Sequence, residues 1–150
     1  MESNQLPDDE EQDEVVSTDS NRRMITGSLS SFWGTPEMVA HLTYEGQTIE
    51  NIPVILDTGA YRCMISPRLI DLLNLPPGEE FDTYSNPQLG EVKTPLYPIT
   101  FTFADTDYTF TQKCQIMPTM YQFGLLLGTE FLRKFTLHYY GQQRYFELVF

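Results

Sequence analysis

The chain has 150 residues, of which 41% are hydrophobic and 13% aromatic, so it can bury one core and a single domain is expected. Its formal net charge of -12 argues against binding to nucleic acids or anionic membranes, because both need a basic surface. Its apolar runs fall far short of the roughly 18 to 20 residues that span a bilayer. The two cysteines and the lack of a signal-peptide pattern favour reduced thiols in a cytosolic setting, and a single disulfide stays open.

The acidity is concentrated at the start of the chain. Residues 1–20 hold eight acidic side chains and no lysine or arginine, with few apolar residues and no periodicity. Such a composition predicts disorder, because too little apolar surface is available for burial. We therefore expect an acidic disordered tail or linker at residues 1–30 and a folded domain at residues 31–150. Both a solubilising spacer and a docking segment remain open for the tail.

From residue 31 onward, short apolar and aromatic runs alternate with Gly, Pro and Asn, which is typical of an all-β domain. The hairpin around residues 99–111 is the clearest, because both of its arms alternate apolar and hydroxyl side chains. Ser66 and Pro67 form a favourable helix start. In chain order, the predicted elements are strands at 38–44, 48–52 and 53–56, a helix at 66–73, strands at 99–103, 108–111, 115–117 and 123–127, a short helix from 129, and strands at 136–140 and 144–150.

The short strand at residues 53–56 leads directly into Asp57, and the chain turns at Thr58-Gly59-Ala60. Two aspartates that share one proton can hydrolyse a peptide bond, one acting as base toward water and the other donating to the substrate carbonyl. The glycine lets backbone amides approach the carboxylate, and the threonine hydroxyl can bond to the opposite loop. The pattern predicts Asp57 as a catalytic carboxylate, with the three following residues supporting its loop.

Two segments of the chain resemble the retropepsins, the single-domain aspartic proteases of retroviruses, LTR retrotransposons and plant pararetroviruses. These segments are 55–60 (ILDTGA) and 125–132 (LLLGTEFL), and the resemblance covers about residues 36–150. The second segment and the helix at 66–73 are most similar to the retrotransposon and pararetrovirus branch. The resemblance implies a closed all-β barrel with a flap hairpin and one or two short helices. It also implies that Leu127 and Gly128 are structural residues near the site.

The resemblance also implies a flap, a hairpin that closes over the substrate, at about residues 84–94. The segment has the Gly, Asn and Pro of a mobile tip, and closure would exclude water from the site. An ordinary surface loop is the alternative interpretation. The candidate residues for the flap tip and for substrate binding are Asn86, Pro87, Gln88, Leu89 and Gly90.

A second catalytic carboxylate is missing from the chain, because the sequence has no other Asp-Thr-Gly and no Asp-Ser-Gly. The Asp105-Thr106-Asp107 segment lacks the glycine and is better explained as a hairpin turn. Asp82-Thr83-Tyr84 lacks the glycine too. We therefore expect the partner carboxylate to be Asp57 of a second subunit, in a symmetric homodimer.

The chain departs from the retroviral pattern at one ion pair. Many retroviral members have an acidic residue just after Asp-Thr-Gly-Ala and an arginine just after the helix-opening glycine, where this chain has Tyr61 and Thr129. Arg62 and Glu130 lie one position further on in each segment. They form either a pair with reversed charges or two unrelated surface charges, and exposed pairs stabilise little.

Other chemistries are poorly supported by the sequence. His41, Cys63, Cys114 and His138 lack the spacing of a zinc site, so we expect neither a metal nor a cofactor. Cys63 is flanked by apolar residues that would raise the pKa of its thiol, which disfavours a nucleophilic role. The sequence also has no Gly-x-Ser-x-Gly motif and no phosphate-binding glycine loop.

The resemblance implies an aspartic endopeptidase that processes a viral or retrotransposon polyprotein, with a polypeptide as substrate. The acidic net charge argues against nucleic acid or membrane as a partner. The tail would then be upstream polyprotein sequence or a spacer. The expected location is the host cytoplasm or a virus-like particle, and not the secreted fraction. Two alternatives remain, a cellular retropepsin-like protease and a catalytically silent dimerisation or peptide-binding module of the same fold.

Overall fold

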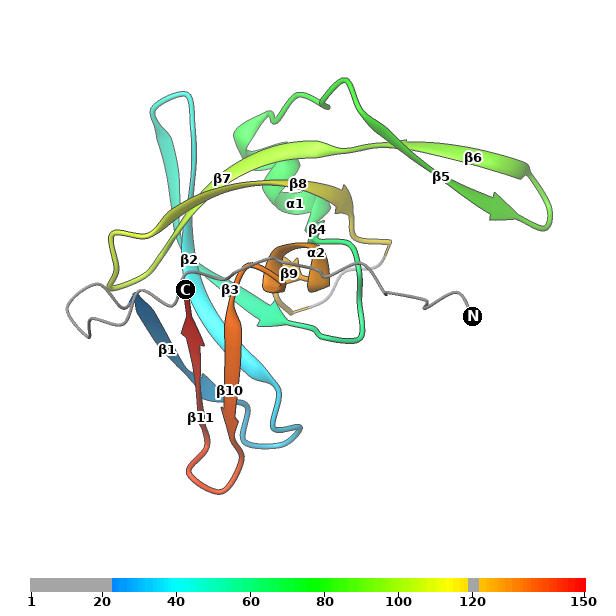
Figure 1. Cartoon of the computed structure of the whole chain (residues 1–150). Helices are drawn as coiled ribbons and strands as arrows, with labels where there is room; N and C mark the ends of the chain where they lie inside the picture. Colours follow the sequence, from blue (N-terminus) through cyan, green and yellow to red (C-terminus); the bar gives the residue numbers. More distant parts are fainter. Residues whose placement is uncertain (1–22, 119–121) are drawn as a thin grey trace, which may run out of the picture.

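The computed structural model describes residues 23–118 and 122–150, which form a β-rich domain with two short helices. A single long sheet and a separate two-stranded hairpin contain all the described strands (Figure 1). In chain order, the elements are β1 (Met24–Leu29), β2 (Pro36–Tyr44), β3 (Gln47–Leu56), β4 (Met64–Ile65), α1 (Pro67–Leu73), β5 (Phe81–Asn86), β6 (Gly90–Pro95), β7 (Tyr97–Phe103), β8 (Thr109–Ile116), β9 (Leu125–Leu127), α2 (Thr129–Leu132), β10 (Thr136–Tyr140) and β11 (Tyr145–Val149).

Six strands close into a barrel. Strands β2, β3, β9, β4, β8 and β7 are neighbours in that order, and β7 pairs back to β2. Alternate residues of β7 point inward, so Ile99, Phe101 and Phe103 are buried while the threonines between them are partly exposed. The rings of Phe101 and Phe103 lie 5.7 and 6.3 Å from that of Phe131, which comes from α2. The predicted all-β closed barrel is confirmed.

The first and last strands form a sheet that extends from the barrel. Strand β11 lies between β1 and β10 and is antiparallel to both. The predicted domain boundary at residues 30 and 31 is therefore wrong, because β1 belongs to the fold. Its Ile25 and Leu29 are 2% and 7% exposed, and Gly27 lies directly against the Phe146 ring. The alternating pattern of β1 is short and follows a highly charged segment, which made it hard to recognise. Residues 1–22 of the predicted tail lie outside the described part of the chain.

Two predicted strand breaks are absent. The segments 48–52 and 53–56 form one strand, β3, and the segment 115–117 is mostly the end of β8. Pro53 suggested a break, but the strand continues through it, pairing Pro53 with Val39. The irregularity lies earlier, at Asn51 (φ 57°), opposite a register shift between Ala40 and Leu42 that marks a bulge.

Both predicted helices are present. Ser66 caps α1 by accepting a hydrogen bond from the Arg68 N–H at 3.3 Å, and Pro67 is its first residue. Asn74 ends α1 in the left-handed region, with φ 49°. Across residues 23–118 and 122–150, neither helix is long and apolar enough to cross a membrane.

Candidate active site

Asp57 follows the end of β3, which is held between β2 and β9. Its N–H donates to the Leu127 carbonyl oxygen at 2.9 Å, which extends the parallel pairing of β3 with β9 by one more bond. The Gly59 N–H donates to the Asp57 Oδ1 atom at 2.8 Å. The Asp57 side chain is partly exposed, and Thr58 and Gly59 are exposed. The turn thus aims a backbone amide at the carboxylate, as expected for the glycine of Asp-Thr-Gly, and leaves the side chain partly exposed.

The loop after Asp57 is fixed by the segment that opens α2. The Thr129 N–H donates to the Ala60 carbonyl at 2.7 Å, and the Glu130 N–H donates to the Tyr61 carbonyl at 3.0 Å. A Cβ atom on Gly128 would lie 2.6 to 2.7 Å from the carbonyl oxygens of residues 60, 61 and 62. Only glycine permits this approach, so Gly128 and the preceding Leu127 lie directly beside the loop that carries Asp57, as the resemblance implies.

Arg62 links this loop to α2 and to the β5–β6 hairpin. Its guanidinium contacts the Glu130 carboxylate at 2.9 Å and the Asp82 carboxylate at 2.5 Å. Glu130 is only 9% exposed, and its second oxygen accepts from the Cys63 N–H at 2.7 Å. The Gln115 amide donates to the other oxygen of Asp82. The reversed pair of Arg62 and Glu130 is confirmed, and the alternative of two unrelated surface charges is wrong.

Asp82 is the member of this network that the sequence did not reveal. It lies 20 residues from Arg62, on strand β5 of the hairpin, and its Asp-Thr-Tyr sequence gives no local sign of this contact. Burial lowers the pKa of the Arg62 guanidinium, but hydrogen bonds and charge from Asp82 and Glu130 outweigh burial and leave the pKa raised. Arg62 is therefore a fixed cation that joins the hairpin base to the Asp57 loop.

We expect Glu130→Gln to lower the free energy of unfolding by about 2 kcal/mol, because it removes the buried carboxylate that pairs with the partly exposed Arg62 guanidinium. The amide oxygen keeps the bond to the Cys63 N–H, and Arg62 keeps Asp82, so the loss is smaller than for an isolated buried pair. Urea unfolding at pH 7 and one fixed protein concentration measures it. The control is Glu80→Gln: the Glu80–Lys113 pair is exposed, so a change within about 0.5 kcal/mol is expected. Equal effects for the two variants would contradict this role of Glu130.

The predicted flap segment forms a hairpin. Strands β5 and β6 pair over their whole length, from Phe81 opposite Pro95 to Asn86 opposite Gly90, and extend away from the barrel (Figure 1). The Asn86 side chain accepts from the N–H groups of Gln88 and Leu89 at 2.8 and 3.0 Å, which shapes the tip. Gly90 has φ +75°, a conformation that favours glycine. Leu89 is 76% exposed, so the tip presents an apolar side chain with no cover.

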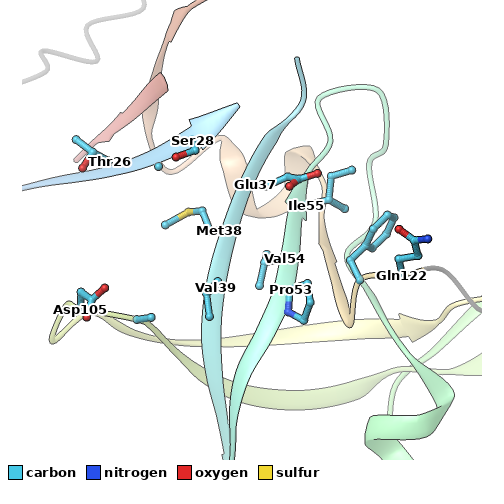
Figure 2. A pocket seen from close by; sticks show the side chains of 13 residues that line it. Thr26, Ser28, Glu37, Met38, Val39, Pro53, Val54, Ile55, Asp105 and Gln122 are labelled. Carbon is cyan, nitrogen blue, oxygen red and sulfur yellow. The ribbon is translucent and has the colours of Figure 1, made fainter. Parts of the chain in front are cut away.

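A hollow in the surface adjoins the strand that leads to Asp57. Ile55 lies two residues before Asp57 and therefore on the same face of the extended chain. It lines a hollow of about 580 Å³ that runs across β1, β2 and β3. Figure 2 shows Ile55 beside Glu37, its cross-strand neighbour. A second hollow of about 330 Å³ lies beside α1. Asp57 lines neither of these two hollows, and its side chain is partly exposed.

The two cysteines are buried and free. Burial raises the pKa of the Cys63 thiol to about 12 and raises that of Cys114 well above its usual value. Glu130 lies beside Cys63 and raises its pKa further, while backbone hydrogen bonds lower it. The predicted inertness of Cys63 as a nucleophile follows from this environment.

We expect thiol reagents to label the folded protein at pH 8 at least about a hundredfold more slowly than the urea-unfolded chain, because the thiolate is the reactive form. The raised pKa of Cys63 also makes the free energy of unfolding depend on pH. Unfolded Cys63 loses its proton near pH 9.0, while the folded thiol keeps it to about pH 12. The folded state binds more protons in this window, so the free energy of unfolding should fall as pH rises from 9 to 12. Equal labelling of folded and unfolded protein would contradict the buried environment.

The barrel, the Asp-Thr-Gly turn at the end of β3 and the glycine that opens α2 define an architecture of the aspartic-protease type. No family model and no curated protein matches the sequence. Among solved structures, a retropepsin-like aspartic protease from Rickettsia conorii matches with a TM-score of 0.59 and 17% identity, over 86% of this chain and 92% of that chain. EIAV protease in complex with the inhibitor HBY-793 matches with a TM-score of 0.43 and 15% identity, over 70% of this chain and 91% of that one. The chain has the retropepsin-like fold, as its two motifs predicted.

Proposed function

We propose that the protein is an aspartic endopeptidase that hydrolyses peptide bonds as a homodimer, with one Asp57 carboxylate supplied by each subunit. One observation carries the proposal: the Gly59 amide orients Asp57 within a retropepsin-like barrel, and the Asp57 side chain is partly exposed. A single carboxylate is insufficient for this chemistry, and the sequence has no second Asp-Thr-Gly. A second copy would supply an identical carboxylate across a two-fold axis.

In the dimer, the two Asp57 carboxylates would hold one proton and one water between them. The ionised carboxylate takes a proton from the water, and the water oxygen attacks the carbonyl carbon of the peptide. The protonated carboxyl donates its proton to the carbonyl oxygen. The carboxyl that took the proton from water then donates it to the leaving nitrogen as the C–N bond breaks, and the other carboxylate takes a proton back from the diol as the carbonyl re-forms. Thr58 would support this arrangement, because the residue is exposed and a threonine hydroxyl can bond to the partner's loop.

The substrate would be an extended polypeptide held between Asp57 and the β5–β6 hairpin. Backbone groups at the hairpin tip, residues 86–90, would bond to the peptide in the manner of an added strand. The Arg62–Asp82 contact fixes the base of the hairpin to the Asp57 loop, so that only the tip has to move on closure. We further propose that this substrate is a viral or retrotransposon polyprotein, processed in the host cytoplasm or in a particle, with the acidic N-terminal residues as upstream sequence or spacer.

The test is hydrolysis of a mixed peptide library by the full chain over a range of protein concentrations. We expect cleavage at mildly acidic pH, inhibition by pepstatin-type transition-state mimics, and a specific activity that rises with protein concentration to a plateau. Sedimentation over the same range should show association at the same concentrations. A specific activity that stays constant where the protein sediments as a monomer would contradict the shared site.

A further inference from the structure

Two large aromatic side chains stand in solvent at the loop between β1 and β2. Phe32 and Trp33 are 81% and 80% exposed, more than any other large hydrophobic residue in residues 23–118 and 122–150. Their rings contact each other edge to face, with centroids 4.6 Å apart. Contiguous exposed apolar surface of this kind marks sites of association more often than isolated exposed residues do.

The loop that carries this aromatic pair is tightly bonded. The Ser30 N–H donates to the Thr35 carbonyl at 2.8 Å, and the Gly34 N–H donates to the Ser30 carbonyl at 3.0 Å. The Ser30 hydroxyl oxygen accepts from the Thr35 N–H at 3.1 Å, and the Tyr139 hydroxyl of β10 donates to the Gly34 carbonyl at 2.6 Å. The chain therefore holds Phe32 and Trp33 outward in a defined conformation, which lowers the entropy cost of using them in a contact.

The strand register places this loop beside the candidate active site. Glu37 of β2 lies opposite Ile55 of β3. Continuing the antiparallel register by two residues places Thr35 opposite Asp57. Figure 1 shows the β1–β2 loop at the end of β2 that pairs with the end of β3. Since Trp33 is two residues from Thr35, its backbone lies within about 12 Å of the Asp57 backbone.

We propose that the Phe32–Trp33 pair packs against a second copy of this chain and forms an apolar contact of the dimer next to the shared site. This inference rests on the proposed function, because two Asp57 carboxylates that share a proton bring the two-fold axis next to Asp57. A loop so near the axis faces the partner subunit. The other candidate occupant in the sequence is the acidic segment at residues 1–20, which offers few apolar side chains to cover two aromatic rings. Aromatic anchors commonly carry much of the binding energy of an interface.

The chain provides its own probe, because Trp33 is its only tryptophan. We expect the tryptophan emission of the full chain to move to shorter wavelength as protein concentration rises, with the midpoint that sedimentation gives for association. Phe32→Ser should raise the dimer dissociation constant about tenfold or more. Leu72→Ser is the matched control: Leu72 is also exposed, on α1, and its replacement should leave the constant unchanged.

Three outcomes would overturn the inference. Trp33 emission that stays at long wavelength in an associated, active enzyme would show that the dimer forms elsewhere, and the proposed function would stand. Emission that shifts only when a pepstatin-type inhibitor is added, at constant sedimentation, would assign the pair to substrate contact. Short-wavelength emission already in the monomer would mean that the chain covers the pair itself. By contrast, a protein that neither cleaves peptides nor associates would refute the proposed function as well.

Discussion

Replacing Asp57 by asparagine is expected to lower peptide hydrolysis by about a thousandfold or more. Asparagine keeps the size of the side chain and still accepts a bond from the Gly59 N–H, but it cannot take a proton from water or hold the shared proton. The loss should fall on kcat, because the carboxylate acts on the reacting atoms and not on the rest of the peptide. Initial rates on one good peptide, measured at a concentration where the protein is dimeric, give the result.

The control for this variant is Asp105→Asn. Asp105 is exposed in the turn between β7 and β8, with φ 61°, and belongs to a sequence that superficially resembles a second catalytic motif. Asparagine tolerates this conformation well, so the fold and the activity should both be unchanged. Substantial activity in the Asp57 variant, or its loss in the Asp105 variant, would place the chemistry elsewhere.

The second large effect is on stability. We expect Gly128→Ala to lower the free energy of unfolding by about 3 kcal/mol or more, because the added Cβ meets three backbone carbonyl oxygens rather than a flexible side chain. The loop of residues 60–62 would have to move away, which would weaken the bonds that it accepts from Thr129 and Glu130. Urea unfolding at one fixed protein concentration measures the change, and any residual activity should fall with it.

Gly46→Ala separates this steric effect from a general cost of replacing glycine. Gly46 lies in the turn between β2 and β3 with φ +78°, and a Cβ there would meet nothing within 4 Å. Its replacement strains only the local backbone, so a loss of about 1 to 2 kcal/mol is expected. A Gly128 variant as stable as the Gly46 variant would show that the Asp57 loop is not held by close packing against Gly128.

Local patterns predicted much of this fold. The cap at Ser66, the alternating arms of the β7–β8 hairpin and the Asp57 turn all depend on neighbouring residues, and all three are present. The predicted domain boundary was wrong because it depended on distant residues. Strand β1 is ordered by pairing with β11, about 120 residues away in the chain, and such distant pairing leaves no local signal.

In the candidate site too, features set by neighbouring residues could be predicted and features set by distant residues could not. The loop residues Asp57 to Ala60 and the supporting Gly128 could be inferred from two short motifs, because each motif encodes a local backbone shape. The role of Asp82 could not, because it depends on where the β5–β6 hairpin meets Arg62 in space. The exposed Phe32–Trp33 pair was missed as well, since an aromatic residue in a short apolar run is most often part of a core.

Mixing wild-type chain with the Asp57→Asn variant tests the shared site most directly. Wild-type protein is held at a fixed concentration above the dimer dissociation constant while the variant is added, and hydrolysis of one peptide is followed after subunit exchange. If each site takes one Asp57 from each subunit, an equal amount of variant should reduce the activity to about half, and an excess should abolish it, because wild-type subunits become trapped in mixed dimers. Activity that stays constant as the variant is added would contradict the shared site.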